Sequence, residues 1–157
     1  MANTIKVKVA TFFECTVRYK RNVEDGSVKK VSEVYVVDAL SFTETEKRIT
    51  EEMLPYVQGD FDVMAIKRTQ YGEYFNTDSD DERFYKAKVV FITIDEKTAK
   101  EKKSPHYYIV RAASIDDAHR KVDDALSNTA IDYEIASLDE TKVLDVFLHD
   151  SNADVTD

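Results

Sequence analysis

The sequence is poor in the residues that crosslink or interrupt a chain. Its 157 residues include one cysteine, two prolines, three glycines and no tryptophan. The lone cysteine, Cys15, cannot form an internal disulfide, which excludes a disulfide-stabilised secreted scaffold and favours a buried, inert thiol. Three glycines are too few to build a glycine-rich phosphate loop. Together with eight phenylalanines and nine tyrosines, this composition predicts a strand-rich protein with short connections.

Long apolar runs are also missing. Residues 1–10 alternate lysine with β-branched residues and lack the run that a signal peptide or membrane helix needs. We therefore expect a cytoplasmic location and no membrane partner.

The net charge of −9 is concentrated at two places. Residues 76–83 and 148–157 each carry −3, and a solvated linker and a fraying terminus account for this. An acidic chain is a poor candidate for duplex DNA binding, although a local basic face can still exist.

What the sequence does contain is an internal repeat. Residues 35–44 (YVVDALSFTE) return in degenerate form as residues 108–117 (YIVRAASIDD). The similarity extends over residues 12–75 and 84–147, with insertions only in loops, as structural repeats tolerate. Each copy carries a serine followed three residues later by an acid, which is typical of a helix N-terminus.

Each repeat is expected to form a strand, a strand, a helix and a strand. An Asp25-Gly26 turn signal predicts a hairpin in the first repeat. The helices are expected over residues 42–56 and 115–127, each with one apolar stripe. The stripes comprise Phe42, Thr45, Ile49, Met53 and Tyr56 or Val57 in the first helix, and Ile115, Ala118, Val122, Ala125 and Leu126 in the second.

The predicted fold class is α+β, with two tandem strand-strand-helix-strand repeats. They would form a mainly antiparallel sheet covered by two helices, with pseudo-two-fold symmetry. The segment after each helix is long for one strand, so it contains a bulge or splits in two, and both options stay open. The expected organisation is an N-terminal arm or strand (1–11), repeat 1 (12–75), an acidic linker (76–83), repeat 2 (84–147) and an acidic, flexible tail (148–157).

No catalytic constellation is visible. His106, His119 and His149 lie far apart in the sequence, and Cys15 has no Cys or His beside it. Zinc-ligand spacing is therefore absent, as are the common nucleophile and metalloprotease motifs. We expect no catalytic residue, no metal and no cofactor, and hence no enzyme.

Two acid pairs occur at matching positions, Asp60 with Asp62 and Asp132 with Glu134. They could hold cations or transfer protons. Alternate positions around one aromatic residue are more typical of a strand whose acids face solvent, and we favour that interpretation.

Two lysine pairs precede tyrosine-bearing strands. Basic residues beside aromatic residues on a sheet can grip single-stranded nucleic acid. The favoured alternative is that the lysines protect sheet edges while the tyrosines pack under helices. The candidate contact residues are Lys29, Lys30, Tyr35, Lys102, Lys103 and Tyr108.

Several segments resemble a family of domains of unknown function from Bacteroidetes and their phages. They are residues 13–19 (FECTVRY), 29–33 (KKVSE), 35–44 (YVVDALSFTE) and 51–53 (EEM). The resemblance implies a lineage and a compact cytoplasmic domain, without an activity or a site.

The function itself is not specified by the sequence. A non-enzymatic intracellular binding or protein-interaction module is the favoured hypothesis, with an unknown macromolecular partner, preferably a protein. The alternatives are a single-stranded nucleic-acid binder that uses the Lys/Tyr hairpins and a phage-type inhibitor that uses an acidic surface. Free edge strands also leave homodimerisation open.

Overall fold

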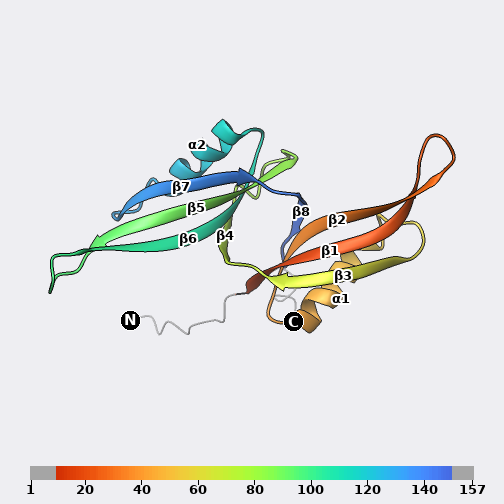
Figure 1. The fold of residues 1–157 in the computed structure, drawn as a ribbon, viewed down its shortest axis with the longest axis horizontal. Coiled ribbons are helices and arrows are strands. Elements are labelled where there is room, and N and C mark those ends of the chain that lie inside the picture. The colour runs from red at the N-terminus through yellow and green to blue at the C-terminus, as the bar shows by residue number, and fades with distance from the viewer. Residues whose placement is uncertain (1–9, 150–157) are drawn as a thin grey trace, which may run out of the picture. The chain divides into compact units, whose positions relative to one another are not determined.

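The computed structural model describes residues 10–149 and shows an α+β protein, as predicted (Figure 1). Most of the expected N-terminal arm (1–11) and acidic tail (148–157) lie outside the described residues. The elements are β1 (Thr11–Asn22), β2 (Val28–Ala39), α1 (Phe42–Met53), β3 (Phe61–Arg68), β4 (Tyr71–Phe75), β5 (Arg83–Ile94), β6 (Glu101–Ala112), α2 (Ile115–Ala125), β7 (Asp132–Glu140) and β8 (Val143–Phe147).

The strands form two sheets rather than the single sheet we expected. The first has the order β3-β1-β2-β8 and the second β4-β6-β5-β7. β1 is antiparallel to β2 and β3, and β5 is antiparallel to β6 and β7, whereas β4 runs parallel to β6. Hydrophobic periodicity identifies strands but does not specify which strands are neighbours. The prediction of a single sheet was therefore wrong about strand pairing, although the strands themselves were expected.

The long segment after each helix is split, and its second half joins the other sheet. β4 follows β3 after only Thr69 and Gln70, yet it pairs with β6, and β8 follows β7 but lies in the sheet of β2. The compact units are therefore Met1–Thr69 with Val146–Asp157, and Gln70–Asp145. They differ from the expected repeats because the last strand of each repeat, β4 or β8, lies in the sheet of the other repeat.

A threonine fixes the chain at each split. The backbone N–H and the hydroxyl of Thr69 both donate to the Phe12 carbonyl, at 3.0 and 2.6 Å. Thr141 does the same to the Phe84 carbonyl, at 2.8 Å for both. These bonds tie the first split to β1 and the second split to β5. Register shifts also show a bulge in β3 and in β7, so both options left open by the sequence occur.

The predicted helix caps are confirmed. The Ser41 hydroxyl accepts from the Glu44 N–H at 3.1 Å, and the Ser114 hydroxyl accepts from the Asp117 N–H at 3.1 Å. Each acid reaches back to a backbone N–H, that of Leu40 or Ala113. Local capping chemistry thus fixes where both helices begin.

Each helix covers one face of its own sheet. The first core contains Cys15, Val17, Val37, Ile49, Met53 and Val57, and the second contains Phe75, Tyr85, Ala87, Val89, Tyr108, Val110, Ala112, Ala118 and Val122. The expected stripes were too wide, because Phe42 and Ile115 in the first turn of each helix and Ala125 in α2 are exposed to solvent. Of the two alternatives at the end of the first stripe, Val57 is buried and Tyr56 is exposed.

One cation on each helix ties that helix to a strand. Arg48 pairs with Asp38 at 2.9 Å and also donates to the carbonyls of Asp38 and Phe147. Lys121 pairs with Asp81 at 3.0 Å and donates to the Arg111 carbonyl at 3.1 Å. The acidic linker is therefore not merely solvated, since Asp81 anchors it to α2.

Candidate binding surface at the first hairpin

The two tyrosines among the expected contact residues, Tyr35 and Tyr108, already stack on other aromatic rings of the chain. The Tyr35 ring stacks on Phe147 with centroids 5.4 Å apart, and Tyr108 stacks on Phe75 at 4.5 Å. Tyr108 is only 8% exposed. Both rings pack on the helix-covered side of their sheets, as the alternative interpretation stated. They are not placed to stack on a nucleic-acid base.

The four lysines are exposed, and strand alternation distributes them over two faces. We call the face of each sheet opposite its own helix the helix-distal face. Lys29 and Lys102 lie on the helix-covered side, whereas Lys30 and Lys103 lie on the helix-distal faces. The expected Lys/Tyr combination is therefore separated in both sheets.

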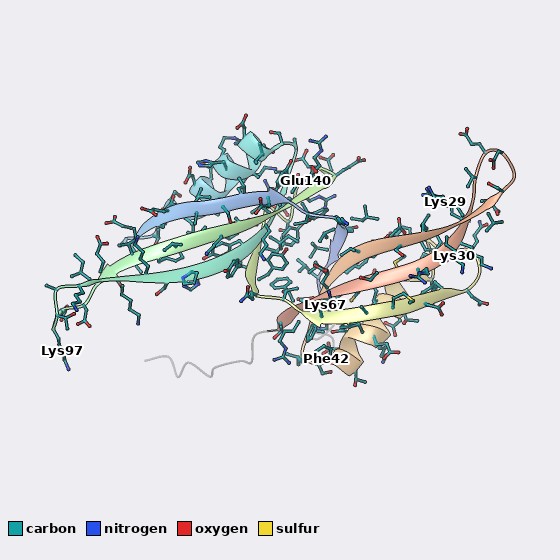
Figure 2. The ribbon with its side chains drawn as sticks, viewed as in Figure 1. Lys29, Lys30, Phe42, Lys67, Lys97 and Glu140 are labelled. Carbon is teal, nitrogen blue, oxygen red and sulfur yellow. The ribbon has the colours of Figure 1, made fainter. Side chains whose placement is uncertain are left out.

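Like charges lie directly opposite each other in the first hairpin. Lys20 is the cross-strand partner of Lys30, and Arg21 is that of Lys29. Opposed like charges destabilise a hairpin because their Cβ atoms are only about 5 Å apart. Arg18 precedes Lys20 on the same face. We call Arg18, Lys20, Arg21, Lys29 and Lys30 the basic hairpin end, and Figure 2 labels Lys29 and Lys30 at the turn end of β2.

Two acids of the hairpin itself are engaged by other residues. Asp25 in the turn accepts from the N–H and the hydroxyl of Ser27, which lowers the pKa of Asp25. Glu33 accepts from the hydroxyls of Tyr35 and Tyr19, and its bond raises the pKa of Tyr19. Among residues 10–149, no ion pair joins a cation of the basic hairpin end to a carboxylate.

The second hairpin lacks this repulsion. Lys103 lies opposite Ile92, and Lys102 lies opposite Thr93. The two hairpins therefore differ in charge although their strands pair in the same way. The opposed like charges distinguish the first hairpin from the second.

A pocket of about 460 Å³ opens beside the basic hairpin end. Arg18, Lys20 and Lys30 line it together with Asp60 and Asp62 at the start of β3. Both acids are exposed and the intervening Phe61 packs on the core, as the solvent-face interpretation predicted. That interpretation did not anticipate that the acids border a cluster of cations.

The sequence interpretation missed Arg18, Lys20 and Arg21. Their signal was present, because three cations within four residues precede the Asp25-Gly26 turn. Only the strand register shows that they meet Lys29 and Lys30.

A family model describing a domain of unknown function, DUF4494, matches residues 11–149. The chain belongs to the DUF4494 family. The expected membership of an uncharacterised domain family is thus confirmed, and the basic hairpin end lies within the matched residues. No curated protein matches the chain, and no solved structure matches it either.

The structure places His106 and His119 of this DUF4494 chain in different environments. His106 packs against the edge of Phe91 at 4.9 Å, whereas His119 lies 3.3 Å from Asp123 on the exposed side of α2. Asp123 also accepts from the Tyr133 hydroxyl, which raises the Tyr133 pKa, the opposite of what a nucleophile needs. Within the described part of the chain, no three His, Cys, Asp or Glu side chains are placed to hold a metal ion.

Neither α1 nor α2, the helices of residues 10–149, is long and apolar enough to cross a membrane.

Proposed function

We propose that the chain is a non-enzymatic module that binds another protein through the basic hairpin end. One observation carries this proposal: two consecutive like-charge pairs, Lys20 with Lys30 and Arg21 with Lys29, occur without an ion-pair partner among residues 10–149. Such pairs weaken the free hairpin, and an anionic partner would remove the repulsion. Local violations of folding rules are expected at functional sites.

Two of the four sheet edges, those formed by β3 and β7, are a poorer contact surface. β3 and β7 are edge strands, and each contains a bulge opposite its partner strand. Both also carry charges, including Asp62 and Lys67 in β3. Bulges and charges protect edges against pairing with another chain. A face or a hairpin end therefore suits a partner better than strand addition does.

Comparative affinity capture tests the proposal. The wild-type chain, a K20E/K30E variant and a K102E/K103E control would each be presented to nuclease-treated extract of the source cells. We expect a protein that is retained by the wild type and the control and lost with K20E/K30E. That protein, once purified, should bind the wild type directly. Retention that is equal on all three chains would contradict the proposal.

Two further proposals accompany this function. A cytoplasmic location fits the single buried cysteine, which has no disulfide partner. A duplicated origin is supported by matched contacts, namely the capping serines Ser41 and Ser114 and the anchoring threonines Thr69 and Thr141.

A second candidate function, binding of single-stranded nucleic acid, is favoured by one feature of the second sheet. The Lys86 ammonium lies 5.0 Å from the centroid of the Tyr107 ring, and Lys88 is the cross-strand partner of Tyr107. These residues share the helix-distal face with Lys103. Labelled oligothymidylate should then bind with salt-dependent affinity and weaken with Y107L, whereas no binding at low salt would remove this candidate.

A further inference from the structure

The pocket at the basic hairpin end has a charge pattern that indicates a particular kind of ligand. Arg18 and Lys20 lie two residues apart on one strand, and Lys30 lies directly opposite Lys20. Side chains at alternate strand positions repeat about every 6.6 Å, and an extended peptide repeats its side chains at the same spacing. Carboxylates at alternate positions of a peptide would therefore match the cations along β1.

The opposite wall of the pocket disfavours a nucleic-acid strand. Asp60 and Asp62 are exposed carboxylates that line the same pocket as Arg18, Lys20 and Lys30. The two carboxylates would repel a backbone with a negative charge at every unit, because phosphate binding depends on neutralisation by cations. A peptide can instead present backbone N–H groups to these two acids.

An adjoining pocket offers an apolar contact. It has a volume of about 480 Å³ and shares Tyr19, Lys20 and Gln58 with the first pocket. Tyr56, which lines it, is 72% exposed. A large exposed aromatic ring beside cations is the kind of anchor found at the centre of protein interfaces. The ligand would thus carry an apolar side chain next to its carboxylates.

The geometry points to an extended acidic segment of a partner protein, with carboxylates at alternate positions and an adjacent apolar residue, as the ligand of Arg18, Lys20 and Lys30. This inference rests on the proposed function and specifies the partner. The carboxylates would attract Lys20 and Lys30 and thereby offset the repulsion between these two cations.

Fluorescence anisotropy with a short labelled peptide of alternating glutamate and leucine tests the inference. We expect binding to the wild type at low salt that weakens as salt is added. K20E/K30E should weaken it by at least about tenfold, and Y56A should weaken it at all salt concentrations because an apolar contact is not screened. K102E/K103E, which makes the same change of charge in the second hairpin, should leave the affinity unchanged.

Three results would overturn the inference. They are no binding of the glutamate-leucine peptide at low salt, equal binding by the wild type and K20E/K30E, and tighter binding of oligothymidylate that K20E/K30E abolishes. Unfolding curves of each variant distinguish lost contacts from lost structure. If the peptide fails while affinity capture still depends on Lys20 and Lys30, the inference about the ligand fails and the proposed function stands.

Discussion

Lys20 and Lys30 lie directly opposite each other on β1 and β2, and no described carboxylate forms an ion pair with either. Arg21 and Lys29 repeat this relationship at the next position. The free hairpin therefore carries a repulsion that no described ion pair relieves. This makes stability and binding separable, because removing one charge should affect them in opposite directions.

The substitution K30E tests that separation. It converts a repulsive cross-strand pair into an attractive one, so we expect the free energy of unfolding to rise by about 0.2–1 kcal/mol. Urea unfolding measures the change, and the glutamate-leucine peptide should bind more weakly. K103E is the matched control, because Lys103 lies opposite the uncharged Ile92 and its substitution relieves no cross-strand repulsion. A destabilised K30E would show that the repulsion is already neutralised in solution.

The ion pair of Arg48 should matter more than a surface pair. The Arg48 side chain is 13% exposed, and it contacts Asp38 and the Phe147 carbonyl at 3.3 Å. R48M keeps the aliphatic stem but removes the charged donors, so we expect a loss of about 1–3 kcal/mol in chemical unfolding. R120M is the control, because Arg120 is 65% exposed in its contact with Asp117. Equal effects of both substitutions would mean that Arg48 is solvated.

The thiol of Cys15 should be nearly unreactive in the folded protein. Burial, with a smaller contribution from Glu14, raises the Cys15 pKa to about 12. A disulfide reagent at mildly alkaline pH should therefore modify Cys15 only as fast as the chain unfolds. Rapid modification without urea would contradict this burial.

The same thiol should make the stability of the protein depend on pH. Above an unfolded-state pKa of about 8.5, the unfolded thiol ionises while the folded thiol stays protonated. The contribution of Cys15 to the free energy of unfolding should thus be fully present below that pH. It should be lost as the pH rises toward about 12. C15A should show a smaller decrease in unfolding free energy over this range. If the free energy of unfolding falls equally with pH in the wild type and in C15A, Cys15 is not the cause of the pH dependence.

The second hairpin loop contains an alanine in a left-handed conformation. Ala99 has φ of +59° and its N–H donates to the Asp95 carbonyl at 2.8 Å. A99G should stabilise the protein by about 1 kcal/mol, because glycine adopts this region without a Cβ clash. N76G is the control, since Asn76 has φ of +66° but asparagine tolerates this region. The midpoints of thermal unfolding compare the two, and a destabilised A99G would contradict the assigned loop conformation.

Splitting the chain between residues 76 and 83 should produce two halves that fold poorly alone. The first half lacks β8 and the second lacks β4, which are edge strands of their sheets. Circular dichroism should show a gain of strand signal when the purified halves are mixed. Full strand content in either half alone would show that folding of that half does not require the strand contributed by the other half.

The local features of this fold could be predicted from the sequence, and the non-local ones could not. Ser41 and Ser114 act within one helical turn, so their spacing to the next acid was sufficient. The placement of β4 and β8 depends on contacts between distant residues, about which a single sequence carries no information.

The candidate site shows the same division. Lys29 and Lys30 were identified from the sequence, whereas Arg18 and Lys20 required the register of the hairpin. Strand alternation alone could have separated Lys30 from Tyr35, because they lie an odd number of positions apart.

The exchange of β4 and β8 also sets an order in time. The first sheet begins with the first described strand, and one of its two outer strands is β8, the last strand among residues 10–149. A ribosome makes the chain from the N-terminus, so β1, β2 and β3 exist long before the strand that borders β2. The first sheet therefore cannot be complete until synthesis has passed residue 147, whereas all strands of the second sheet are available once residue 140 has emerged. The part of the protein that is translated first is the last to be finished.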